Sequence, residues 1–104
     1  MATANSLEIR QSEKYEGDEW WSWSVWVEGP DSELDEIDFV EYTLHPTFRK
    51  PVREIRDRSS KFMLSTAGWG GFRIFVRIAK KDQREIRLRH DLTLYYPSGR
   101  ATDT

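Results

Sequence analysis

Hydrophobic and polar residues alternate along most of the chain between residues 20 and 96. In WWSWSVWVE (20–28), one face carries Trp21, Trp23, Val25 and Val27, and the other carries Trp20, Ser22, Ser24 and Trp26. In FRIFVRIA (72–79), apolar residues recur at every second position from Phe72 to Ile78. A period of two residues predicts strands that bury one face in an antiparallel sheet.

Shorter runs with strand character occupy residues 7–11, 38–44, 52–56, 61–64, 84–89 and 91–96. Residues that favour turns lie between them, at 28–32, 45–51, 65–71, 80–83 and 96–99. KKDQ (80–83) joins two alternating runs and predicts a hairpin loop. Seven to eight short strands with no long helical pattern predict an all-β fold, an immunoglobulin-like antiparallel β-sandwich.

The segment DSELDEIDFVEY (31–42) fits two structures. Ser32 and Asp35 resemble a helix capping box, and the apolar residues that follow have helical spacing. From about Asp38 onward, aromatic and β-branched residues favour a strand. We expect a strand from that point.

The length of 104 residues predicts one domain, covering 1–104, with residues 1–6 and 98–104 frayed. Aromatic residues make up 13% of the chain and supply a large apolar surface for one core. The absence of cysteine excludes disulfides and favours a reducing compartment. No segment approaches the roughly 18 apolar residues that a membrane helix needs, so no membrane segment is expected.

Charge is distributed unevenly along the chain. Residues 1–40 carry eleven acidic and two basic residues, whereas residues 41–104 carry seven acidic and fourteen basic residues. The favoured interpretation is that the two halves attract each other within one domain. The alternative, a nucleic-acid partner, is less favoured and would use a basic patch formed by Arg49, Lys50, Arg53, Arg56, Arg58 and Lys61.

The residues needed for common catalytic sites are missing. With no cysteine and only His45 and His90, we expect no metal site. No GxSxG motif and no glycine-rich phosphate loop occurs. His90 and Asp91 are neighbours in a predicted strand, so their side chains would face opposite ways. We therefore expect neither an enzyme nor a cofactor.

Two short segments combine an aromatic residue with small or hydroxyl residues: LHPTF (44–48) and GWGGF (68–72). Pro46 restricts the first segment to a rigid turn that displays Thr47 and Phe48. Glycines around Trp69 give the second segment backbone freedom and permit close approach of another chain. On composition alone, two turns whose aromatic residues plug one end of the sandwich are favoured over recognition loops.

Three longer stretches resemble the YEATS domain family: VEYTLHPTFRKPVREI, KFMLSTAGWGGFRIFVRI and HDLTLYY. SVWVEGP is similar to an early strand of the same family. The resemblance covers roughly residues 20 to 96, and the pairing of LHPTF with GWGGF is its most specific part. It is at least as close to the prokaryotic branch of the family as to the nuclear branch.

The resemblance implies a non-catalytic reader of acylated lysine, with acetyllysine or crotonyllysine in a peptide or protein as the partner. Phe48 and Trp69 would form the walls of an aromatic slot. Thr47 would hydrogen-bond the acyl amide together with the backbone N–H of Trp69, and His45 would orient its neighbours. The second loop would be completed by Gly68, Gly70, Gly71 and Phe72.

Two positions depart from the family pattern. The usual aromatic residue of a third wall falls near Glu19, so Trp20 or Trp21 would substitute for it. Ser59 and Ser60 replace a frequent proline pair.

These departures motivate an alternative, an interaction module of a bacterial signalling or defence protein that keeps the fold without reading acyl-lysine. The resemblance implies a module of a larger protein or complex, cytoplasmic in a prokaryote, which is slightly favoured, or nuclear in a eukaryote.

Overall fold

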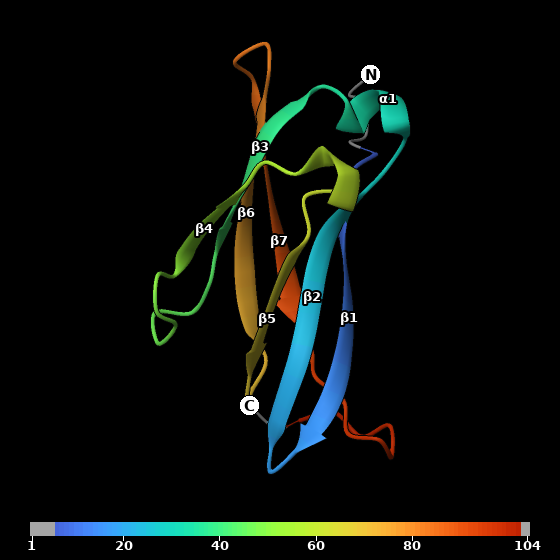
Figure 1. The fold of residues 1–104 in the computed structure, drawn as a ribbon, viewed down its shortest axis with the longest axis vertical. Helices are drawn as coiled ribbons and strands as arrows, with labels where there is room; N and C mark the ends of the chain where they lie inside the picture. Colours follow the sequence, from blue (N-terminus) through green and yellow to red (C-terminus); the bar gives the residue numbers. More distant parts are fainter. Residues whose placement is uncertain (1–5, 103–104) are drawn as a thin grey trace.

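The computed structural model describes residues 6–102, which form two packed β-sheets (Figure 1). The elements within this range are β1 (Glu8–Gly17), β2 (Trp20–Glu28), α1 (Asp31–Leu34), β3 (Ile37–Thr43), β4 (Val52–Ile55), the 3-10 turn η1 (Arg58–Ser60), β5 (Leu64–Gly68), β6 (Phe72–Lys80) and β7 (Glu85–Leu92). One sheet has the order β1-β2-β5, and the other has the order β4-β3-β6-β7. All neighbouring strands are antiparallel, so the predicted immunoglobulin-like sandwich is confirmed.

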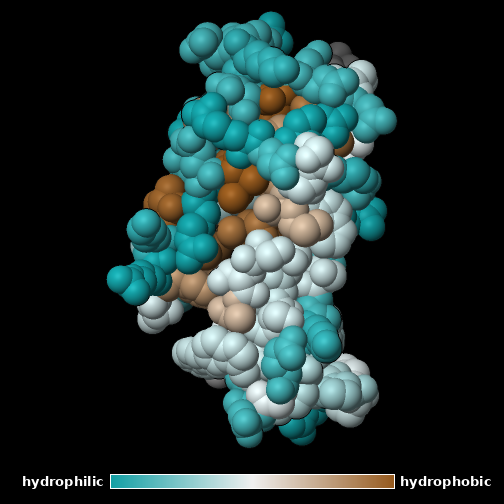
Figure 2. All heavy atoms as spheres, viewed as in Figure 1, coloured by the Kyte–Doolittle hydropathy of each residue, from teal (hydrophilic) through white to brown (hydrophobic). Residues whose placement is uncertain are grey.

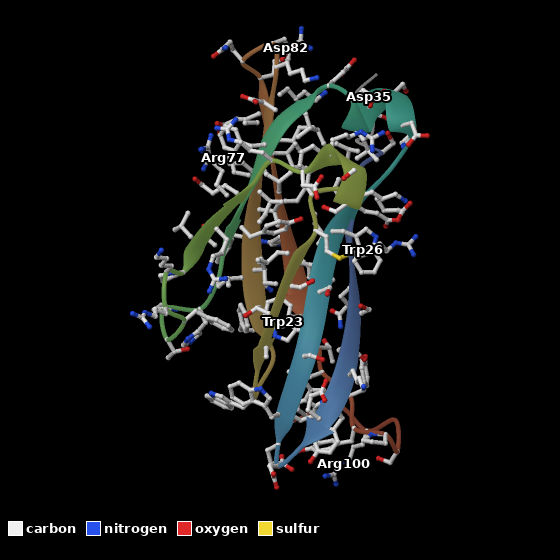
Figure 3. The ribbon with its side chains drawn as sticks, in the orientation of Figure 1. Trp23, Trp26, Asp35, Arg77, Asp82 and Arg100 are labelled. Atoms are coloured by element: carbon white, nitrogen blue, oxygen red, sulfur yellow. The ribbon has the colours of Figure 1, made fainter. Side chains whose placement is uncertain are left out.

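The core follows the alternation seen in the sequence. On β2 the inward residues Trp21, Trp23, Val25 and Val27 are buried, as are Ile74, Val76 and Ile78 on β6. Figure 3 shows Trp23 within the sandwich and Trp26 on its outer side. The predicted faces of these two strands are confirmed, because each strand buries one face between the sheets.

The segment after β2 contains both structures that its sequence fits. Residues 31–34 form a single helical turn, and β3 begins at Ile37, one residue before the predicted start. The predicted capping box does not form, because Pro30 is the N-cap and no side chain caps the turn. Strand pairing with β4 and β6 outweighs continuation of the helix.

The predicted strand is wrong for residues 61–63, and the predicted turn is wrong for residues 65–68. Lys61 and Phe62 have φ angles of 60° and 59°, which exclude an extended strand, and β5 occupies Leu64–Gly68. The Asp57 side chain accepts a hydrogen bond from the backbone N–H of Ser59 and fixes the turn before it. This turn buries Phe62 completely, and that burial is a tertiary contact without a local sequence pattern.

Two further strands differ from the prediction, and one predicted loop agrees with it. β1 continues to Gly17 because it pairs with β2 along its whole length. The predicted strands at 84–89 and 91–96 are one strand, β7, which pairs with β6 from Phe72 to Ala79 and ends at Leu92. The predicted hairpin at 80–83 is confirmed, with the N–H of Lys80 bonded to the carbonyl of Arg84 at 2.8 Å.

The end of the described chain is folded back on itself. The N–H of Tyr96 bonds to the carbonyl of Arg100 at 2.9 Å, and Tyr95 forms a β-bridge with Ala101. Residues 98–102, which are predicted to be frayed, thus take part in backbone hydrogen bonds, whereas 1–5 and 103–104 lie outside the described residues. No helix in the described range is long and apolar enough to cross a membrane.

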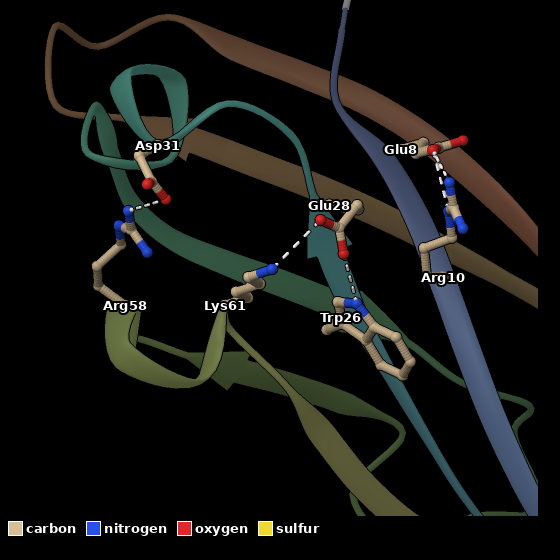
Figure 4. A network of polar contacts seen from close by, with 7 residues as sticks. All are labelled: Glu8, Arg10, Trp26, Glu28, Asp31, Arg58 and Lys61. Carbon is tan, nitrogen blue, oxygen red and sulfur yellow. Dashed lines mark hydrogen bonds and ion pairs between the residues drawn. The ribbon is translucent and has the colours of Figure 1, made fainter.

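Ion pairs join the acidic and basic halves of the chain, as the favoured interpretation of the charge asymmetry predicts. Arg58 lies 3.2 Å from Asp31, and Lys61 lies 3.2 Å from Glu28 (Figure 4). Arg56 in turn lies 3.1 Å from Asp38. These pairs are largely exposed, so each stabilises the fold by only about 0 to 1 kcal/mol.

Candidate functional site

A cavity of about 280 Å³ lies where the β3–β4 loop and the β5–β6 loop meet at one end of the sandwich. In Figure 1 these loops are the green loop beside β4 and the short connection at the lower end of β5. The lining residues are Trp20, His45, Thr47, Phe48, Arg49, Ala67, Gly68, Trp69, Gly70, Gly71 and Phe72. LHPTF and GWGGF are therefore two sides of one cavity rather than two separate turns.

The first loop is closed by short-range hydrogen bonds. The N–H of Phe48 bonds to the carbonyl of His45 at 2.9 Å, and the N–H of Leu44 bonds to the carbonyl of Pro51 at 2.7 Å. The N–H of Thr47 donates to Nδ1 of His45 at 3.2 Å, which requires that ring nitrogen to be unprotonated. The Thr47 hydroxyl lies 2.9 Å from the same nitrogen and therefore donates to it. Its oxygen lone pairs remain available to a ligand N–H.

A cluster of aromatic rings supports the first loop from beneath. Phe48 and Phe72 have ring centroids 5.3 Å apart, and Trp23 meets them edge-on at 6.2 and 5.9 Å. His45 lies 6.1 Å from Phe72. Sequence reasoning did not connect Trp23 with the site; the signal was its inward position on β2, two residues beyond Trp21.

The second loop presents Trp69 to solvent. Its side chain is 57% exposed, and no ring contact involves it among the described residues. A Cβ at Gly68 would lie 3.5 Å from Cζ of Phe48 and 3.7 Å from Nε1 of Trp23. Within residues 6–102 the glycines with positive φ are Gly17 and Gly99, so the glycines beside Trp69 contribute small size rather than left-handed backbone.

The two residues suggested for the third wall have different positions. Trp20 lines the cavity and is 45% exposed. Trp21 does not line it: the side chain is fully buried, and its Nε1 donates to the carbonyl of Tyr95 at 2.8 Å. Trp21 faces inward because β2 alternates, so only its neighbour reaches the cavity. Arg49 and Ala67 line the cavity without having been predicted.

His90 lies away from the cavity and contacts the other sheet. Its Nε2 is 2.7 Å from Oε1 of Gln11 on β1, and burial lowers the pKa of this imidazole. The neighbouring Asp91 instead pairs with Arg73 at 2.7 Å, so His90 and Asp91 face apart as predicted. Among residues 6–102 no group of three or more His, Asp or Glu side chains could hold a metal ion.

The cavity thus combines exposed aromatic surfaces with one oriented hydroxyl and the backbone of a glycine-rich loop. The lining residues include no carboxylate, so they contain neither a carboxylate pair nor a metal-ligand cluster. Such a surface suits a flat, uncharged group that needs one hydrogen-bond donor and one acceptor.

Known proteins resemble this chain in sequence and in structure. The family model described as the prokaryotic YEATS domain matches residues 21–93. The Protein AF-9 homolog of Schizosaccharomyces pombe is 32% identical over 97 residues, which cover 88% of this chain and 44% of that protein. Transcription initiation factor TFIID subunit 14 of the same yeast is 36% identical over 66 residues, which cover 62% of this chain and 27% of that protein. The chain spans less than half the length of either relative.

Two solved structures share the fold. The Yaf9 YEATS domain bound to H3K27ac aligns with a TM-score of 0.70 and 24% identity, over 92% of this chain and 80% of that chain. The Yaf9 YEATS domain recognising an H3K122suc peptide aligns with a TM-score of 0.64 and 26% identity, over 92% of this chain and 72% of that chain.

Proposed function

This chain belongs to the YEATS domain family, and from that membership we propose that it is a non-catalytic reader of acylated lysine, with acetyllysine or crotonyllysine as its ligand. The observation that carries the proposal is the position of the Thr47 hydroxyl. It is oriented by His45 within a cavity lined on opposite loops by Phe48 and Trp69.

The chemistry of the ligand fits these groups. Acylation converts a lysine ammonium, which is costly to desolvate, into a neutral amide. The amide N–H would donate to Oγ1 of Thr47, and the acyl oxygen would accept from the backbone N–H of Trp69. A planar acyl group between two rings gains roughly 0.5 to 1.5 kcal/mol per aromatic contact beyond its buried area.

Two relatives support the choice of ligand class. The solved Yaf9 domains are described as binding an acetylated and a succinylated histone peptide. The present chain shares their fold, and the lining of its cavity includes the Thr47 hydroxyl together with Phe48 and Trp69. We also propose that it acts as a module of a larger prokaryotic protein in the cytoplasm.

Peptide titration tests the proposal. Peptides that differ only in one lysine, which is unmodified, acetylated, crotonylated or trimethylated, are titrated against the protein by fluorescence anisotropy. We expect acylated forms to bind at least about tenfold more tightly than unmodified lysine, with Trp69→Ala abolishing the preference. Trp26→Ala is the matched control, because Trp26 lies outside the cavity lining.

An acyl preference that survives Trp69→Ala would place the binding elsewhere on the domain. Binding of trimethyllysine alone would indicate a cation-π cage instead. Equal binding of all four peptides would favour the alternative, an interaction module that keeps the fold and does not read acyl groups.

A further inference from the structure

The β3–β4 loop and the start of β4 carry three cations that the fold does not neutralise. Arg49, Lys50 and Arg53 form no ion pair with any carboxylate among residues 6–102. By contrast, Arg56, Arg58 and Lys61, which follow shortly after in the chain, each pair with an acidic residue from the first half of the chain. The attraction between the two halves therefore leaves one local excess of positive charge beside the cavity.

The conformation of this loop is set by Arg53. Its Nε donates to the carbonyl of Lys50 at 2.6 Å, and its Nη2 donates to the carbonyl of Arg49 at 2.9 Å. Lys50 has a φ angle of 55°, so the chain turns sharply at that residue. These two backbone carbonyls would otherwise repel an anion, but each accepts a hydrogen bond from Arg53. The side chains of Arg49 and Lys50 stay exposed.

The location of the charges points to the rim rather than to the interior of the cavity. Arg49 directly follows the Phe48 wall and lines the cavity, whereas Lys50 and Arg53 lie outside its lining. A group held inside the slot could meet only Arg49. An extended peptide that crosses the rim could meet Arg49 and Lys50 together.

We propose that the site selects acylated lysines that have acidic residues beside them in the sequence, with Arg49 and Lys50 binding those carboxylates. The proposal rests on the proposed function, because the acyl-lysine must occupy the slot for its neighbours to reach the rim. Asp18 and Glu19 directly precede the lining residue Trp20, but neither lines the cavity, and the carboxylate of Glu19 accepts a hydrogen bond from the hydroxyl of Tyr96. Because the free cations lie on one of the two loops, acidic residues should be more effective on one side of the acyl-lysine than on the other.

The test uses crotonyllysine peptides with two acidic residues, two alanines or two lysines on either side of the modified residue. Exposed charge pairs are weak, so we expect the favoured acidic peptide to bind roughly threefold to tenfold more tightly than the alanine peptide at low salt. The gain should shrink in about 0.5 M salt, because exposed charges are screened.

Two double variants and a single variant locate the effect. Arg49→Gln with Lys50→Gln should abolish the tighter binding of the acidic peptide. Lys50→Gln alone, at a residue outside the cavity lining, should reduce that effect while binding to the alanine peptide is retained. Lys81→Gln with Arg89→Gln removes the same charge from exposed residues outside the cavity lining and without ion pairs in the described structure, so it should retain the gain. Equal melting temperatures of the variants confirm that all of them are folded.

The remaining outcomes separate the two proposals. Failure of every crotonylated peptide to bind would overturn the proposed function and this inference with it. Binding that depends on crotonylation but not on the flanking charge would overturn the inference alone. A flanking-charge gain that persists in the Arg49 and Lys50 variant would also overturn it. Three other results would also overturn the inference, because each would show that Arg49 and Lys50 bind a different anion. These results are equal binding of an unmodified acidic peptide, a preference for succinyllysine between alanine residues, and binding of duplex DNA.

Discussion

The proposed role of Thr47 in binding would be separable from any role in folding. Its side chain is exposed, and among residues 6–102 its hydroxyl is hydrogen-bonded to the ring of His45 two residues earlier. With Nδ1 of His45 unprotonated, the hydroxyl gives its hydrogen to His45 and keeps its oxygen lone pairs free. In the proposed complex, Oγ1 would accept from the ligand amide, and the backbone N–H of Trp69 would donate to the acyl oxygen.

We expect Thr47→Val to weaken acyl-lysine binding by roughly fivefold to thirtyfold, because the ligand N–H would lose its acceptor inside the slot. Thr47→Ser keeps the hydroxyl and should bind within about threefold of the original protein. Calorimetric titration measures both, and the melting temperature should not change in either variant. Equal loss in the two variants would show that the methyl group matters rather than the hydroxyl.

His90 makes the free energy of unfolding depend on pH. Burial lowers its pKa in the folded state, so the unfolded chain binds the proton more readily than the folded chain does. The contribution of His90 to stability is present above its unfolded pKa of about 6.5 and is lost as pH falls from there toward its folded pKa. Asp91 partly opposes this effect, because its negative charge favours the protonated imidazole.

We therefore expect the free energy of unfolding in urea to decrease between about pH 7.5 and pH 5.5, with a smaller slope in His90→Gln. Most carboxylates titrate below this range, so they contribute little to the difference between the two proteins. If the free energy of unfolding changed equally with pH in His90→Gln and in the original protein, His90 would not be the group responsible.

At the scale of elements, the segment from Asp57 to Met63 shows where local sequence fails to determine structure. Strands β2 and β6 could be predicted closely because each alternates and buries one face, whatever its partner. The segment 61–63 has apolar residues too, but its conformation depends on the distant Tyr42, whose hydroxyl donates to the carbonyl of Phe62 at 2.7 Å. A long-range contact of this kind leaves no periodic pattern in the chain.

Tyr42→Phe should lower the free energy of unfolding by about 1 to 2 kcal/mol, because the buried carbonyl of Phe62 would lose its donor. Burial raises the pKa of Tyr42 well above its usual value, so its hydroxyl remains a donor at all ordinary pH values. Tyr15→Phe makes the same chemical change at a partly exposed hydroxyl and should lower the free energy of unfolding by less. Chemical denaturation measures both values. Equal costs would argue against the buried bond.

Gly68 gives a second prediction for an element, the end of β5. An added Cβ would meet Phe48 and Trp23 at ordinary contact distances of 3.5 and 3.7 Å. Gly68→Ala should therefore raise stability by about 0.4 to 1 kcal/mol, because alanine restricts the unfolded chain more than glycine does. A decrease in melting temperature would show that Phe48 cannot adjust to the methyl group.

At the scale of the whole molecule, the candidate site is formed by residues far apart in the sequence. The pairing of LHPTF with GWGGF could be predicted from the family resemblance, and so could the proximity of His45, Thr47, Phe48 and residues 68–72. The resemblance alone left both Trp20 and Trp21 open, whereas the alternation of β2 places Trp21 in the core and Trp20 on the other face. From the sequence, Arg49 could be recognised only as one member of a basic run. Which members of that run lack an ion pair depends on the folded structure, because Arg56, Arg58 and Lys61 pair with distant acidic residues.

The exposed surface also has a larger-scale pattern. Figure 2 shows a mostly hydrophilic face with hydrophobic side chains visible between β4 and β5, the edge strands of the two sheets. The exposed Val52 of β4 and Met63, which directly precedes β5, contribute to the apolar surface of these two segments. The sandwich is therefore less fully closed on this side than between β1 and β7, where Gln11 and His90 are hydrogen-bonded.

The two loops that form the cavity are anchored differently. The β3–β4 loop joins strands of one sheet, whereas the β5–β6 loop crosses from one sheet to the other. The spacing of the two loops is consequently linked to the distance between the sheets, and Trp23 packs against Phe48 of the first loop and Phe72 at the end of the second. Because a packed core is only slightly compressible, the cavity would accept only ligands below a fixed thickness. Thin, planar acyl groups would enter, and branched ones would require the sheets themselves to separate.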